Sequence, residues 1–135
     1  MSLFRFMLDT NIVSNVVRDP YGRASRTIDA RGVDRVCTSV LVAAELRYGA
    51  AKSLSSRLPE MVDVVLRRLS VLPLEPPADR EYARIRHELV SAGKPIGPVD
   101  LLIAAHALSL DLTLVTANVG EFSRVPGLRV ENWLD

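Results

Sequence analysis

Short apolar segments alternate along this chain with longer segments of helical periodicity, and this alternation is the feature that most restricts its fold. Strands are predicted at 3–8, 35–38, 71–74, 113–116 and 128–130. Helices are predicted from the capping residues at 9–11 to about residue 18, at 24–31, 39–52, 56–69 and 78–92, and from 97–98 onward. Strands separated by helices predict an α/β fold with three layers, a mainly parallel sheet flanked by α-helices. In such folds the working site lies at the carboxyl ends of the strands.

Composition predicts one domain over residues 1–135. With 135 residues, 48% of them hydrophobic and 24% charged, the chain is long enough to bury a core without a disulfide or a structural metal. Cys37 has no partner cysteine, so an intramolecular disulfide and a Cys-rich zinc site are both excluded. The apolar stretch 3–8 is short and interrupted by Arg5, and the longest uncharged apolar run, 101–110, is about half a membrane span. We therefore expect a cytoplasmic protein with no membrane partner.

The net charge of the chain neither indicates nor excludes a nucleic-acid partner. Seventeen basic and sixteen acidic residues give a net charge of +1, and local arrangement matters more than this total. Nearly all basic residues are Arg, whose side chain can bind phosphate through two hydrogen bonds. The same bias is typical of a GC-rich genome, which is the interpretation we favour. At 5% aromatic residues, a stacking platform for single strands is not expected.

Four acidic residues fall near strand ends or on apolar helices. Asp9 directly follows the first strand and could either cap the next helix or belong to a site, since Thr10 or Asn11 could cap instead. Glu45 lies in an almost wholly apolar helix, where a carboxylate is costly unless it is paired or binds a cation. The alternative is a helix rotated so that Glu45 meets water, with an Arg such as Arg47 as its partner. Asp100 sits in the first turn of an apolar helix, which the helix dipole alone would explain, and Glu121 lies with Asn118 in a predicted turn.

Such a group of carboxylates points to a hard divalent cation. Oxygen ligands without His or Cys favour Mg²⁺, with Mn²⁺ possible, over zinc. The chemistry that most uses such a cluster is phosphodiester hydrolysis. No Ser-His-Asp or Cys-His grouping and no Gly-rich phosphate loop competes with this reading. His87 is expected to be solvated and His106 to be packed in the core, on a stripe with Val99, Leu102, Ile103 and Leu110.

Several blocks of the chain, in order, resemble the PIN-domain ribonucleases, and particularly the VapC-type toxins of bacterial toxin–antitoxin pairs. The matching blocks cover nearly the whole chain and lie at 6–11, 45–50, 97–107, 114–122 and 125–133. This resemblance implies a PIN fold and a metal-dependent endoribonuclease. It further implies that Asp9 and Asp100 are the principal metal ligands and that Glu45 holds the metal or its water.

The fourth position of the site departs from the family pattern. Many PIN domains carry an Asp after the fourth strand, where this chain offers Asn118 or Glu121. We place Glu121 among the catalytic acids and Asn118 among the supporting residues, with the choice between them open. Thr10 and Asn11 are expected to hold Asp9 by hydrogen bonds, and Thr116 to do the same near the fourth position. Ordinary capping is equally compatible with all three. The residue before the third acid is Val99 in place of the common aromatic, which should matter little for metal binding.

The resemblance also implies partners. These are an RNA substrate, with tRNA or rRNA favoured, a cognate VapB-type antitoxin that inhibits the enzyme, and a second copy of the chain in a homodimer. A PIN-related nuclease acting on DNA flaps or in RNA maturation is an alternative, although the chain leaves little room for the added elements that such enzymes use. An aspartate-nucleophile phosphatase is another, although Asn11 stands where its second acid is usually needed. The third is a non-catalytic, PIN-like protein-binding module.

Overall fold

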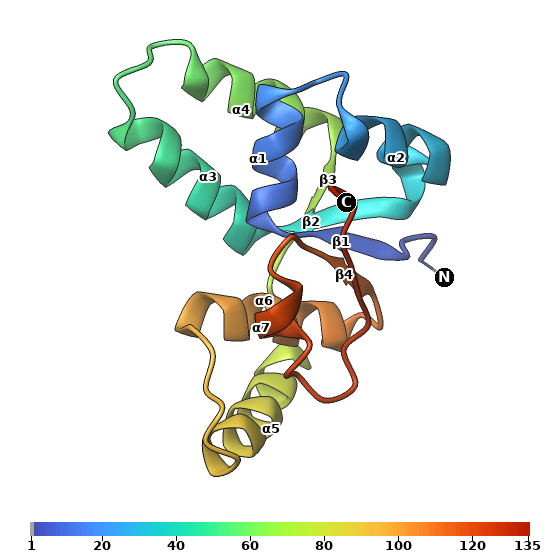
Figure 1. The fold of residues 1–135 in the computed structure, drawn as a ribbon, viewed down its shortest axis with the longest axis vertical. Helices are drawn as coiled ribbons and strands as arrows, with labels where there is room; N and C mark the ends of the chain where they lie inside the picture. The colour runs from blue at the N-terminus through green and yellow to red at the C-terminus, as the bar shows by residue number, and fades with distance from the viewer. Residues whose placement is uncertain (1) are drawn as a thin grey trace.

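A five-stranded sheet, parallel throughout, lies in the middle of the structure with the strand order β3-β2-β1-β4-β5 (Figure 1). The computed structural model describes residues 2–135. In register, Met7 of β1 pairs with Cys37 of β2 on one side and with Leu114 of β4 on the other. The strands are β1 (Phe6–Leu8), β2 (Val36–Ser39), β3 (Ser70–Leu72), β4 (Thr113–Val115) and β5 (Val130–Glu131). The predicted mainly parallel sheet is confirmed.

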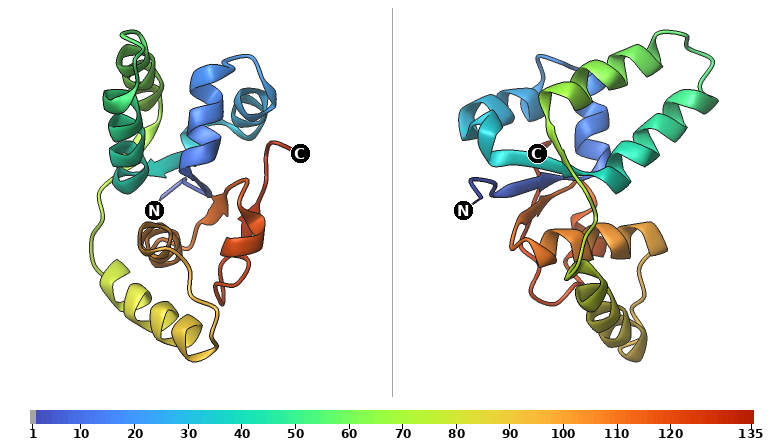
Figure 2. Two further views of the ribbon diagram at one scale, coloured as in Figure 1. Left: turned by 60° about the vertical axis from the view of Figure 1, so that its left-hand side comes forward. Right: turned by 180° about the vertical axis from the view of Figure 1, so that it is seen from behind.

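Helices cover both faces of this sheet, as Figures 1 and 2 show. On one side lie α1 (Thr10–Arg18), α2 (Arg23–Arg31), α3 (Val40–Lys52) and α4 (Leu58–Arg68). On the other side α6 (Pro98–Ser109) has α5 (Ala78–Ser91) packed against it, and the short α7 (Val119–Phe122) follows β4. A 3₁₀ turn, Val33–Arg35, leads into β2. The three-layer α/β/α arrangement is therefore confirmed. Within residues 2–135, no helix has the length and apolar character needed to cross a membrane.

The core is built on the three central strands, because their side chains meet helices on both faces. Met7, Leu8, Cys37, Leu114 and Val115 are fully buried. Burial raises the pKa of the Cys37 thiol to about 12, so this cysteine is a packed core residue with little thiolate character.

Several elements differ from their predicted extents. The first strand begins at Phe6, since residues 3–5 precede the ladder, and α7 falls where a turn was expected. The last strand is Val130–Glu131, two residues beyond the predicted start. The predicted apolar stripe on α6 is wrong, because Val99 and Leu110 are substantially exposed. This helix is instead buried between the sheet and α5, and its buried residues are Leu101, Ile103, Ala104, Ala105, His106 and Ala107.

Both histidine predictions are confirmed, and Ser39 caps α3. His106 is buried and its Nδ1 lies 2.8 Å from Ser39 Oγ, whereas His87 is exposed. Ser39 accepts a hydrogen bond from the backbone N–H of Leu41 at 3.0 Å, which satisfies one free amide at the start of α3.

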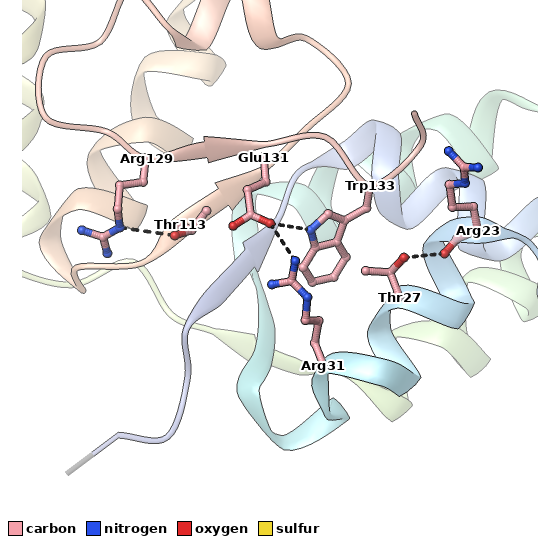
Figure 3. Close-up of polar contacts among 7 residues, drawn as sticks. All are labelled: Arg23, Thr27, Arg31, Thr113, Arg129, Glu131 and Trp133. Atoms are coloured by element: carbon pink, nitrogen blue, oxygen red, sulfur yellow. Dashed lines mark hydrogen bonds and ion pairs between the residues drawn. The ribbon is translucent and has the colours of Figure 1, made fainter.

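The C-terminal segment is fastened to the start of the sheet by the side chain of Trp133 (Figure 3). Its ring packs edge-on against Phe6 with centroids 5.1 Å apart, and its Nε1 donates to Glu131 Oε1 at 3.0 Å. Arg31 of α2 donates to the same carboxylate oxygen at 3.3 Å, with its guanidinium 5.4 Å from the centroid of the Trp133 ring. This cluster holds the end of the chain against β1 and α2.

Candidate active site

The candidate site lies at the carboxyl ends of β1 and β4, where the order of strands reverses. From β1 the chain passes to β2 and β3 on one side, and only later to β4 on the other. In parallel sheets this reversal leaves a crevice outside the strand ends, which is the usual place for a ligand. Asp9 follows β1 and Thr116 follows β4, and the Asp9 N–H donates to the Val115 carbonyl oxygen at 2.8 Å. Pairing of the two strands thus brings together residues more than a hundred positions apart.

Asp9 occupies the N-cap position of α1, yet its side chain caps nothing. Its Oδ2 accepts hydrogen bonds from Thr116 Oγ1 at 2.8 Å and from Asn11 Nδ2 at 3.3 Å. The residue is only 3% exposed. Burial raises the pKa of the Asp9 carboxyl, and the hydrogen bonds from Thr116 and Asn11 oppose that rise. The capping interpretation of this side chain is therefore wrong, and its carboxylate is held toward the crevice at an energetic cost.

Asn11 and Thr116 tie this carboxylate to the loop after β4. Asn11 Oδ1 accepts from the Ala117 N–H at 2.8 Å, and its Nδ2 lies 3.3 Å from Thr116 Oγ1. Thr116 is fully buried and also accepts from the Asn118 N–H at 3.0 Å. These bonds leave neither side chain much freedom, so Asp9 is oriented by a rigid frame.

Glu45 is half-buried on α3, with Thr10 beside it. Thr10 Oγ1 donates to Glu45 Oε1 at 2.5 Å. Thr10 therefore supports Asp9 through a backbone hydrogen bond, as expected of this residue, whereas its hydroxyl is directed toward α3 and serves Glu45. The alternative of a solvated Glu45 paired with Arg47 is wrong, since Arg47 pairs with Asp63 at 2.5 Å.

Asp100 and Glu121 lie next to each other at the start of α6. A Cβ built on Gly97 would be 3.9 Å from Asp100 Oδ2 and 4.0 Å from Glu121 Oε1. Burial first, and then the nearby charges of Glu121, Asp9 and Glu45, together raise the pKa of Asp100 to about 7. Between the two residues considered for the fourth position, it is Glu121 that stands beside Asp100.

Glu121 is held as an ionised carboxylate by its hydrogen bonds. Burial works against ionisation, but the Gly97 N–H donates to Oε1 at 3.1 Å and Asn118 Nδ2 donates to Oε2 at 2.6 Å, and the pKa of Glu121 is lowered overall. The exposed Asn118 therefore acts on the site through Glu121. Gly97 was missed as a contact of the acidic cluster, and no local signal could reveal it, because 24 residues separate the two partners.

No ion pair among the described residues neutralises any of the four carboxylates, although the charge of Arg124 acts on Glu121. Five ion pairs join the described residues, and none of them includes Asp9, Glu45, Asp100 or Glu121. Because like charges held this close destabilise one another, a cation would be bound favourably here. In the part of the chain that the structure describes, no three Asp, Glu, His or Cys side chains are close enough in this arrangement to hold one metal ion. Mg²⁺ is commonly held by only one or two carboxylates, with water and substrate phosphate completing its shell, so the all-oxygen donors fit it.

Comparison with known proteins agrees with this fold. Residues 6–128 match the family model described as PIN domain. The chain is 42% identical over 134 residues to ribonuclease VapC2 of Haemophilus influenzae, covering 98% of this chain and 100% of that protein. It is 38% identical over 132 residues to the tRNA(fMet)-specific endonuclease VapC of Salmonella typhimurium, covering 97% and 99%. A chain in the crystal structure of DNA-bound VapBC from Salmonella typhimurium superposes with a TM-score of 0.91 at 38% identity, covering 96% of this chain and 98% of that one. The chain belongs to the PIN-domain family and, within it, to the VapC proteins.

Proposed function

We propose that this chain is a metal-dependent endoribonuclease and the toxin of a type II toxin–antitoxin pair. The observation that carries the proposal is the Asp9 carboxylate, which is buried, is held by Thr116 and Asn11, forms no ion pair among the described residues, and interacts with the charges of Glu45 and Asp100. A purely structural carboxylate in this place would cap α1 or pair with an Arg. Support also comes from the relatives, which are named ribonuclease VapC or endonuclease VapC.

Asp9 and Asp100 would hold Mg²⁺ or Mn²⁺. The carboxylates of Glu45 and Glu121 would add negative charge near the bound cation. When bound, such a cation lowers the pKa of water and neutralises charge that develops on the phosphate. Asp100, with a pKa of about 7, is partly protonated near neutrality, so proton loss from this residue would accompany cation binding. Activity should therefore rise with pH through about 7.

Glu45 would orient or deprotonate the attacking water. Thr10 engages Oε1 at 2.5 Å and fixes the direction of the carboxylate, while Oε2 remains to accept a proton from water. In hydrolysis the water oxygen bonds to phosphorus, one P–O ester bond breaks, and the leaving oxygen gains a proton. Glu45 would take the proton that the water loses, which is a general-base role.

The proposed partners follow from the same relatives. The solved structures similar to this chain include VapBC complexes from Salmonella typhimurium and Rickettsia felis, which supports a VapB-type antitoxin that binds and inhibits this chain. The Salmonella relative is named for tRNA(fMet), so tRNA is the first RNA to test and rRNA the second. We further propose that the chain forms a homodimer and acts in the cytoplasm.

The test compares wild type with Asp9→Asn on purified tRNA and rRNA, with Mg²⁺, with Mn²⁺ and with a chelator. We expect cleavage by wild type in either metal, none in the chelator, and none by Asp9→Asn at a native circular dichroism spectrum. Asp29→Asn, on the exposed face of α2, is the matched control and should cleave like wild type. Wild-type cleavage in the chelator would refute metal dependence, and an active Asp9→Asn protein would remove Asp9 from the mechanism.

Neither the phosphatase nor the binding-module alternative gains support from the site. Asn11 stands where a phosphatase would need its second acid, and its side chain is engaged by Ala117, Thr116 and Asp9. A non-catalytic binding module would have no need to bury Asp9 against other carboxylates. Failure of wild type to cleave any RNA, together with binding of a protein partner, would favour the binding module.

A further inference from the structure

A groove runs along α1 and α3 from the acidic site. Its volume is about 220 Å³. Its polar lining residues are Thr10, Ser14 and Arg18 on α1 and Glu45 on α3, and the rest of its lining consists of Val17, Leu46, Gly49, Ala50, Leu58 and Val62. Thr10, Ser14 and Arg18 are spaced four residues apart, so they form one polar stripe on a single face of α1. The stripe starts at the Thr10–Glu45 hydrogen bond and ends at a positive charge. The groove is thus continuous with the site.

Arg18 is available to a ligand at the far end of this stripe. Its side chain is exposed, and its guanidinium donates to Ser14 Oγ at 2.5 Å, which aligns it along α1. No ion pair among residues 2–135 includes Arg18, whereas Arg31, Arg47, Arg84 and Arg129 each meet a carboxylate. A hydroxyl partner orients the guanidinium and leaves its charge unneutralised.

We propose that this groove binds the RNA backbone on one side of the scissile phosphate and that Arg18 contacts a phosphate there. The inference rests on the proposed ribonuclease function. Eight residues of helix separate Thr10 from Arg18, or about 12 Å at 1.5 Å per residue. At roughly 3.4 Å per nucleotide of a stacked strand, Arg18 reaches a phosphate about three or four nucleotides from the site. A cation at this distance offsets the repulsion that the four carboxylates exert on an approaching polyanion.

The test measures binding of fluorescently labelled bulk tRNA to the full chain in Mg²⁺, with Asp9→Asn as background to prevent cleavage. Adding Arg18→Ala should raise Kd about fivefold, as expected for one exposed charge pair. Loss of one phosphate contact should also reduce the slope of log K against log salt by about 0.7–0.9. Arg18→Lys should recover part of the affinity. The matched control, Arg80→Ala on the exposed face of α5, should leave both quantities unchanged.

Gly49 offers a second, independent test inside the groove. A Cβ built there meets no heavy atom within 4 Å, and α3 tolerates any good helix former better than glycine. Gly49→Glu and Gly49→Gln place side chains of equal size in the groove and differ in charge. Glu should weaken tRNA binding more than Gln, and the difference should shrink at high salt.

The kinetic signature separates this role from damage to the site. With catalytic Asp9 restored, Arg18→Ala should raise KM for tRNA and leave kcat unchanged, because Arg18 touches substrate away from the reacting atoms. An unchanged Kd and salt slope, or a fall in kcat at unchanged KM, would overturn the proposal. So would loss of antitoxin binding with tRNA binding intact, which would make the groove a protein site. Absence of any RNA cleavage by wild type would instead refute the ribonuclease function itself.

Discussion

Replacing Asp100 by Asn should stabilise the metal-free protein above pH 7 and have little effect in acid. In the folded chain the pKa of Asp100 is raised from 3.8 to about 7, first by burial and then by Glu121, Asp9 and Glu45. The folded state therefore binds this proton more tightly than the unfolded state does. Its contribution to stability is fully present below pH about 4, is lost as pH rises from there through about 7, and is constant above.

The difference between the two pKa values corresponds to about 4 kcal/mol at 1.36 kcal/mol for each pH unit. Asp100 is only half-buried, so solvent screening reduces the expected gain to about 1–2 kcal/mol. For a chain of this size that gain corresponds to a rise in Tm of roughly 3–8 °C.

The measurement is thermal unfolding in chelator at pH 5 and pH 8, followed by circular dichroism, for wild type, Asp100→Asn and the control Asp29→Asn. Asp100→Asn should exceed wild type by much more at pH 8 than at pH 5, and Asp29→Asn should match wild type within about 0.5 kcal/mol at both. Adding Mg²⁺ at pH 8 should raise the Tm of wild type and narrow the gap, because a cation relieves the same repulsion. An Asp100→Asn advantage that is absent, or equal at the two pH values, would refute the idea that the cluster carries unfavourable charge.

Three further predictions concern other parts of the molecule. Glu45→Gln should lower RNA cleavage by orders of magnitude and relieve the growth arrest that expression of wild type alone should cause; equal toxicity at matched soluble levels would show that Glu45 is not catalytic. Thr116→Val removes the hydroxyl that donates to Asp9 and should reduce metal affinity or cleavage about 10–100-fold, with Thr116→Ser retaining most of it, as measured by Mg²⁺-dependent rates. Trp133→Ala should cost about 3–5 kcal/mol in urea unfolding while tRNA affinity per folded molecule stays unchanged, since the ring packs against Phe6 at the amino end of β1 and the site lies at the carboxyl end of that strand; a loss under 1 kcal/mol would contradict its anchoring role.

Much of the fold could be predicted because the relevant signals are local. The apolar run before Asp9, the cap at Ser39 and the periodicity of 78–92 each depend on residues close together in the chain, and the predicted elements appear in the structure. The predicted apolar stripe on α6 was wrong because this helix is buried both by the sheet and by α5. Val99, a member of the predicted stripe, is exposed in its first turn. The short helix α7 was missed because four residues carry too little periodicity to be distinguished from a turn.

The acidic residues themselves could also be identified from sequence, because a carboxylate in an apolar helix or after a buried strand is conspicuous without coordinates. The hydrogen-bond partners of these acids could not be identified from sequence. Thr116 lies 107 positions from Asp9, Thr10 lies 35 from Glu45, and Gly97 lies 24 from Glu121. Pairing depends on parallel β1 and β4 ending side by side and on the angle at which α3 and α6 pack, and no local preference encodes either.

The sequence by itself therefore determined the alternation of strands and helices, the family resemblance and the set of candidate acids, since each follows from residue type and spacing. Only the tertiary structure decided that Asp9 is held by Thr116 without capping α1, that Thr10 serves Glu45, and that Glu121, supported by Asn118, stands beside Asp100. The physical reason is that these outcomes depend on hydrogen-bond geometry and on desolvation within a shared crevice, which exist only after distant segments have packed together.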